Sequence, residues 1–410
     1  QALDSNTTAS NNVAVGHQAM LYNTTGTQNV AVGQTALNAN TTADNNTAVG
    51  YQSLTANTTG TQNTAVGKTS LTTTTTGSFN SAFGSSALYS NSTGSNNTAF
   101  GRVALYANTT ADNNTAVGYN SLAANTTGTQ NTAVGSLALQ SITTSSTCSA
   151  FGYSALKVTT GAQNSGFGAY SLSNNSSGAQ NTAVGYQALR QATTADNNTS
   201  VGWRTMDANT TGAENTAVGK GALFANTTGN NNVAIGDKAL DANTTASNNT
   251  AVGQNALTAN TTGGSNVAVG ALALDASTTG NYLTAIGMGA LGSNTTADNN
   301  TAVGYKALDV NTTGANNVAV GSLTLDAATT ANNNTAVGQG AMSGTTTGSD
   351  NTAVGLSALY TNTTGANNVA IGRTSLFSNT SGAKNVSVGN YSLDANTTAS
   401  DNTAVGYNSL

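Results

Sequence analysis

The sequence predicts an all-β protein in which about 24 short coils stack as a β-solenoid, or β-roll. Three observations support this: a Gly recurs at every seventeenth position, Val, Ile or Phe precedes it in each copy, and Leu or Met follows four residues later. Self-similarity at a fixed period is the signature of a repeat architecture. One coil has too few apolar side chains to fold alone, so neighbouring coils must complete its core.

We number the repeat from Asn46, so that one unit runs from Asn46 (position one) to Gln62 (position seventeen). The recurring Gly is position five, and its spacing changes only once, when the step from Gly152 to Gly168 is shorter by one residue. We expect one continuous rod over residues 1–410, with a register shift of one residue between 152 and 168 that is absorbed in a turn. Both ends lie in mid-repeat, which indicates a segment of a longer chain.

Positions two to four, Thr-Ala-Val in this unit, predict a short strand. Successive strand residues point to opposite faces, so positions two and four share one face and the Ala takes the other. We expect stacking to join Val, Leu and Ala into a continuous core ladder. The invariant Gly predicts a positive φ or a close approach of two backbones at a corner.

Positions six to nine, Tyr-Gln-Ser-Leu, fit either a second strand or one short helical turn, and both alternatives stay open. Positions twelve to seventeen, Asn-Thr-Thr-Gly-Thr-Gln, predict a turn. Positions six, seven, ten and sixteen vary freely, which is typical of solvent-facing sites. The Asn of position one predicts a ladder of stacked amides. The absence of Pro fits coils that all donate backbone N–H groups to a neighbour.

Composition argues against several functions. Ten Lys and Arg against fifteen Asp and Glu form no basic surface for nucleic acid, and no apolar stretch is long enough for a membrane segment. The only His, His17, lies at a variable position, and the only Cys, Cys148, replaces a position-one Asn as a small buried residue. The Asp residues of positions ten and sixteen predict a solvated face rather than a calcium ladder. We therefore expect no enzyme activity, metal or cofactor.

The strings NNVAVG, NTAVGYQAL and NVAIG resemble the head repeats of trimeric autotransporter adhesins and similar repeats of phage-type tail fibres. The resemblance covers the whole chain and implies a β-roll of stacked coils, usually three chains side by side, at the cell surface. The repeat unit of this chain is longer than the coil of that family, and the Asn-Thr-Thr turn holds the extra length. Self-association as a trimer or fibre is implied by the resemblance. The residues themselves fit a trimer and a single-chain solenoid equally.

These features predict a non-enzymatic extracellular fibrous protein that serves as a surface adhesin, spacer or matrix filament. The alternative is a Thr-rich solenoid that binds ice or carbohydrate, because a Thr-Thr pair recurs in most coils. Adjacent Thr side chains on a strand would point to opposite faces, which argues against a flat ice-binding array. Aromatic residues at position ten, such as Tyr89 and Phe377, are either isolated surface residues or platforms for sugars.

The Asn of position twelve, followed by two Thr or Ser residues, is a formal acceptor for N-glycosylation. We expect it in an exposed turn, where it would form a polar ridge that carries covalent glycans, while the position-one Asn stays bare. A turn in which Asn and Thr cap backbone groups explains the same pattern. The predicted acceptors are Asn6, Asn23, Asn40, Asn57, Asn91, Asn108, Asn125, Asn175, Asn209, Asn226, Asn243, Asn260, Asn294, Asn311, Asn362, Asn379 and Asn396.

Overall fold

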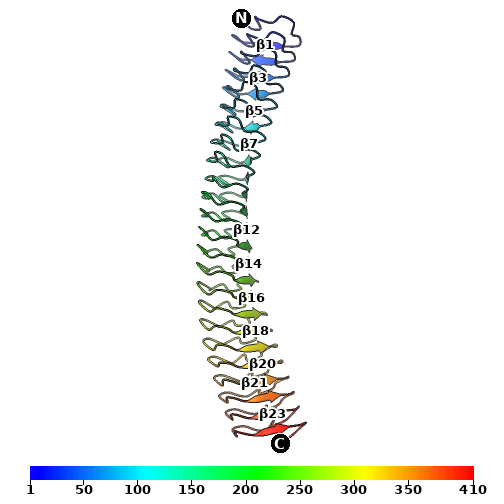
Figure 1. The fold of residues 1–410 in the computed structure, drawn as a ribbon, viewed down its shortest axis with the longest axis vertical. Helices are drawn as coiled ribbons and strands as arrows, with labels where there is room; N and C mark the ends of the chain where they lie inside the picture. Colours follow the sequence, from blue (N-terminus) through cyan, green and yellow to red (C-terminus); the bar gives the residue numbers. More distant parts are fainter. The chain divides into compact units, whose positions relative to one another are not determined.

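A computed structural model describes all 410 residues and contains 24 strands and no helix. The chain forms two compact units, Gln1–Val201 and Gly202–Leu410, and each is described by itself. Within each unit, coils with one short strand apiece stack on one another, as the ribbon shows (Figure 1). The predicted β-solenoid is confirmed, whereas the single rod over 1–410 stays a prediction. No helix is present that could span a membrane.

The strands of the first unit are β1 (Val13–Val15), β2 (Val30–Val32), β3 (Thr47–Val49), β4 (Thr64–Val66), β5 (Ser81–Phe83), β6 (Thr98–Phe100), β7 (Thr115–Val117), β8 (Thr132–Val134), β9 (Ser149–Phe151), β10 (Ser165–Phe167), β11 (Thr182–Val184) and β12 (Thr199–Val201). The strands of the second unit are β13 (Thr216–Val218), β14 (Val233–Ile235), β15 (Thr250–Val252), β16 (Val267–Val269), β17 (Thr284–Ile286), β18 (Thr301–Val303), β19 (Val318–Val320), β20 (Thr335–Val337), β21 (Thr352–Val354), β22 (Val369–Ile371), β23 (Val386–Val388) and β24 (Thr403–Val405).

Strands of successive coils pair in parallel, with partners one full repeat apart, as in Val30 of β2 and Thr47 of β3. The exception is the pairing of β9 with β10, where the partners Ser149 and Ser165 are closer in the sequence by one residue. The missing residue belongs to the following turn, where Thr159 takes the buried place that Asn holds in most other coils. The register shift is therefore absorbed in a turn, as predicted.

The core of each coil lies between the strand and the corner that follows it. Ala48, in the middle of β3, and the corner residues Ser53 and Leu54 are fully buried. The flanking strand residues Thr47 and Val49 lie on the outer face and are only half-buried. The prediction that Val joins the core ladder is wrong: Ala48 and Val49 point to opposite faces, and it is the Ala face that is buried.

The corner at positions six to nine is neither a strand nor a helical turn. Gln52 and Leu54 have φ angles of 55° and 51°, in the left-handed region, which costs roughly 1–2 kcal/mol for an L-residue. Backbone hydrogen bonds compensate: the Gln52 N–H donates to Gln34 O at 3.0 Å, and the Leu54 N–H donates to Ser70 O at 2.9 Å. The corner therefore pairs with the coil before it and with the coil after it. Burial of the Leu side chain adds about 2 kcal/mol.

The Gly of position five has both features expected from the sequence, a positive φ and a close approach to another backbone. Gly67 has a φ of 137°, and a Cβ atom placed on it would lie 2.6 Å from the carbonyl carbon and oxygen of Gly84. These atoms belong to the backbone of the next coil, which cannot move away without breaking the stack. Only Gly therefore fits this corner.

Candidate functional site

The position-twelve Asn side chains lie inside the coils, which corrects the prediction that they are exposed. All of the predicted acceptors except Asn6 and Asn396 are fully buried. Asn40 Nδ2 donates to Asn23 Oδ1 at 2.7 Å and to Ala43 O at 3.0 Å. One amide therefore closes its own turn and bonds the coil before it. A glycan on these nitrogens is incompatible with the folded stack, and a continuous glycan ridge at position twelve is no longer expected.

This buried amide ladder has a direction, because each side chain donates to the Oδ1 atom of the preceding coil. An Asn is therefore left with an unpaired oxygen where the next coil has another residue at position twelve. The buried Oδ1 atoms without a partner are those of Asn57, Asn125, Asn175, Asn260 and Asn311. The residues that follow them by one coil are Thr74, Ile142, Ala192, Ser277 and Ala328. Each interruption that directly follows an Asn thus leaves a buried acceptor unsatisfied.

Repair of one interruption should stabilise the protein. Ser277→Asn would supply a donor to Asn260 Oδ1 and remove the unpaired Ser277 hydroxyl, and we expect a gain of about 1 kcal/mol. The gain in the free energy of unfolding can be measured by chemical denaturation. Thr279→Asn, at an exposed position of the same turn, is the control and should change stability by less than about 0.5 kcal/mol. Equal effects of the two substitutions would contradict the ladder as the cause.

The position-one Asn residues form the second buried ladder, and this prediction is confirmed. The backbone N–H of Asn63 donates to Asn46 Oδ1 at 2.9 Å, while Asn63 Nδ2 donates to Gly77 O at 2.8 Å. Because the donor to Oδ1 is a backbone group, a different side chain still satisfies the preceding Asn. Cys148 illustrates this, since its N–H donates to Asn131 Oδ1 at 2.9 Å.

The two residues with the greatest chemical reactivity do not form a site. Burial raises the pKa of the Cys148 thiol, which keeps it in the less nucleophilic protonated form. His17 lies exposed on the surface, in a coil remote in sequence from Cys148. Both placements agree with the sequence interpretation.

Position sixteen has a structural role that the sequence interpretation missed. Asp44 Oδ1 accepts a hydrogen bond from the backbone N–H of Thr27 at 2.6 Å, and Asp298 Oδ1 accepts one from Asn281 at 2.7 Å. Ser95 and Asn230 accept in the same way in other coils. The position is partly exposed, as predicted, but it also bonds the preceding coil. Its frequent Asp, Ser and Asn residues are the acceptors that an unpaired N–H group of the preceding coil needs.

The Thr-Thr pair presents only one free hydroxyl per coil. At position thirteen, Thr24 Oγ1 donates to Thr41 O of the next coil at 3.0 Å, and Thr58 does the same to Thr75 O at 3.1 Å. At position fourteen, residues such as Thr42 and Thr59 are exposed. The exposed hydroxyls therefore form a single narrow row along each unit, which agrees with the expectation that the two adjacent Thr residues do not form one flat array.

The first surface is the outer face of the strands, where an unbroken apolar row at position four runs beside position two, which is Thr or Ser in most coils and Val in the others. Position four carries Val, Ile or Phe in every coil, and neither position two nor position four carries a charge. Phe100 is 56% exposed and Ile235 is 39% exposed. Adjacent Phe residues of this row contact each other: the rings of Phe151 and Phe167 are parallel to within 9°, with centroids 5.0 Å apart, and those of Phe83 and Phe100 are tilted by 32°, with centroids 5.6 Å apart.

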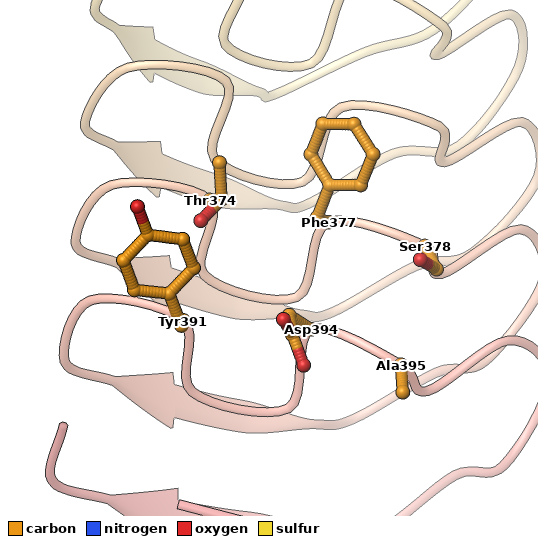
Figure 2. Close-up of a pocket in the computed structure, with 6 residues that line it drawn as sticks. All are labelled: Thr374, Phe377, Ser378, Tyr391, Asp394 and Ala395. Atoms are coloured by element: carbon orange, nitrogen blue, oxygen red, sulfur yellow. The ribbon is translucent and has the colours of Figure 1, made fainter. Parts of the chain in front are cut away.

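The second surface is a line of hollows between positions seven and ten of successive coils in Gly202–Leu410. Four hollows recur there at equivalent places, around Phe224, Asp275, Tyr360 and Phe377. Figure 2 shows the last of these, with Thr374 and Asp394 between the rings of Phe377 and Tyr391. We call this line of hollows the lateral groove. The sequence pointed to the aromatic residues of position ten but not to their partners at position seven.

Comparison with protein-family models and with curated protein sequences finds no match for this chain. The likeness to adhesin heads and tail fibres therefore depends on the repeat motif alone.

Proposed function

We propose that this protein is a non-enzymatic fibrous protein of the cell surface or extracellular space, which acts as a spacer or adhesin and associates with copies of itself. The outer strand face is the observation that supports this. It presents an uncharged apolar row in each unit, of Val and Phe in Gln1–Val201 and of Val and Ile in Gly202–Leu410. Extended apolar patches on soluble proteins are commonly interaction sites.

The spacing of this row favours a second copy as its occupant. The exposed side chains recur once per coil, at the spacing of parallel strands, about 4.8 Å. Another solenoid of the same kind carries side chains at the same spacing, so that contacts would repeat along the whole length. A globular partner has no such periodicity and would match the row at a few coils only.

Charges placed on the outer strand face should separate the copies. The test variant carries Lys at Ile235, Ile286, Val354 and Ile371. An ammonium group in an apolar interface is costly to desolvate, so we expect the variant to sediment as a single chain while the unmodified protein sediments as an oligomer. Analytical ultracentrifugation over a range of concentrations measures this.

The control variant carries the same four charges at position six, outside the strand face. Its Lys residues replace Gln254, Ala271, Gln339 and Leu356. Lys68 and Lys220 show that position six accepts Lys in other coils. The control should remain an oligomer. A single-chain sedimentation coefficient for the unmodified protein, or equal dissociation of both variants, would refute self-association through the strand face.

The ice-binding alternative receives less support from the geometry. An ice-binding surface needs a flat array, whereas the position-thirteen hydroxyls are occupied in bonds between coils. The exposed position-fourteen row is one residue wide. Carbohydrate binding is supported by a different surface, the lateral groove.

A further inference from the structure

We propose that the lateral groove of Gly202–Leu410 binds an extended, uncharged oligosaccharide that lies along the stack of coils. This goes beyond the proposed fibrous role, because the groove and the outer strand face are formed by different positions of the repeat. The proposal depends on the shape of the groove, on its aromatic residues and on the balance of its charges.

The four hollows lie at the same positions of the repeat, and each is lined by residues of two or three successive coils. Residues of positions seven and ten border every one of the four hollows, and position six or eleven completes each lining. Stacked coils set equivalent positions about 4.8 Å apart. This is close to the length of one sugar residue in an extended glycan. Because the hollows are aligned along the stack of coils, a linear polymer would fit them better than a compact ligand.

Aromatic side chains line three of the four hollows. Tyr360 and Phe377 belong to adjacent hollows, and their rings stack with centroids 5.2 Å apart and planes within 5°. Tyr391 adds a second ring to the hollow of Phe377 (Figure 2). Trp203, which is 47% exposed, lines the first hollow together with Phe224. Rings that remain partly exposed in a hollow can pack against the C–H faces of sugar rings.

Polar groups beside these rings match the hydroxyls of a sugar. The hollow of Phe377 also holds the Asp394 carboxylate and the hydroxyls of Thr374 and Ser378. The hollow of Tyr360 holds the amide of Gln339 and the hydroxyl of Ser343. A few polar groups set among apolar ones are typical of small-molecule sites, where they fix the orientation of the ligand.

Charge balance favours an uncharged glycan over an acidic one. Arg204 pairs with Asp207 at 2.8 Å, and Lys306 pairs with Asp309 at 3.3 Å. The Arg204 guanidinium also lies 4.7 Å from the centroid of the Phe224 ring. Asp394 places a carboxylate in the hollow of Phe377, which would repel an acidic sugar. Across the four hollows, four cations face four carboxylates, so that the groove as a whole offers no excess of cations for a polyanion. These side chains are Arg204, Lys220, Lys238 and Lys306 and Asp241, Asp275, Asp309 and Asp394.

The test is affinity electrophoresis in gels that contain one uncharged polysaccharide each: hydroxyethyl cellulose, mixed-linkage β-glucan, galactomannan or amylopectin. We expect at least one of them to retard the unmodified protein. The double variant Phe377→Ser/Tyr391→Asn should lower the affinity at least about tenfold, because each ring contact contributes about 1 kcal/mol. Both replacements occur naturally at the same positions of other coils, in Ser343 and Asn120, so the fold should be retained.

Tyr282→Asn is the matched control. Tyr282 is 67% exposed at position seventeen, outside the groove, and Asn is common at that position. This variant should be retarded as strongly as the unmodified protein. Absence of retardation in all four gels, or equal retardation of the double variant, would overturn the proposal. Sedimentation of the double variant should not change, which separates this test from that of self-association.

Discussion

Leu105→Asp should open the coils around β6 and β7. Leu105 is fully buried at position nine, and the one cation of its corner, Arg102, is exposed and lies over the Tyr119 ring. A buried charge without a partner costs about 3–5 kcal/mol, and the lost apolar contacts add to this. The backbone itself does not oppose the change, because Leu105 has a φ of 53°, and Asp adopts this region more readily than Leu. Burial of the charge is therefore the cause of the expected loss.

Hydrogen exchange followed by mass spectrometry measures the effect coil by coil. Faster exchange should be confined to the first unit and be greatest near residue 105. Lys68→Asp, at an exposed position-six site of the same unit, should leave the exchange rates unchanged. If both variants exchanged equally fast, the assignment of position nine to the core would be wrong.

Gly270→Ala should break the stack in the second unit. Gly270 has a φ of 133°, and the added Cβ atom would lie 2.7 Å from both the carbonyl carbon and oxygen of Gly287. Strain in φ and the clash with backbone act together, so we expect a loss of about 3 kcal/mol or more. Thermal and denaturant unfolding of the variant, followed by circular dichroism, measure this loss.

Gly221→Asn provides the comparison within the same unit. Gly221 also has a positive φ, of 63°, but the nearest atom to a new Cβ would be Asp241 Oδ1 at 3.7 Å. Position seven carries Asn in other coils, such as Asn120 and Asn255. The change should therefore cost less than about 1 kcal/mol. A similar loss in both Gly variants would show that close backbone approach is not the reason for the invariant Gly.

The fold class was predictable because the same short pattern recurs in every coil. The regular Gly, the strand before it and the buried Leu were found from spacing alone. Deletion of one residue near Thr159 without loss of strand register was also predictable, since turns tolerate a change of length better than paired strands do.

The faces of the strand were not predictable from alternation. The pattern Thr-Ala-Val shows that Ala and Val point in opposite directions, but not which of them points inward. General hydrophobicity favours Val, whereas the structure buries Ala48 and leaves Val49 on the outer face. The position of Ala48 has room for only a small side chain, as Gly166 of β10 shows: a Cβ there would lie 3.3 Å from Cγ of the position-nine Leu156.

The sequence contained evidence that the position-twelve Asn is buried, although the glycosylation motif suggested exposure. The residues that replace Asn there include Ile142 and Ala328, which an exposed Asn-Thr-Thr turn does not require. The spacing of Asn57 and Gly60 is another signal, because the side-chain amide closes onto the carbonyl three residues later at 2.9 Å. The polar composition of the turn suggested exposure to solvent, because one of the two hydrogen bonds that satisfy the buried amide, that of Asn57 to Asn40, is made to another coil.

The direction of the two Asn ladders bears on how the chain assembles. In both ladders the later coil donates and the earlier coil accepts, as Asn57 does to Asn40 and Asn63 does to Asn46. A folded coil thus presents two oriented amide oxygens to the segment that follows it in the chain. Folding that begins near the N-terminus during synthesis would meet a prepared template at each step. The stack therefore has a chemical direction: the C-terminal side of each coil offers amide oxygens as acceptors, and the N-terminal side of the next coil supplies the donors.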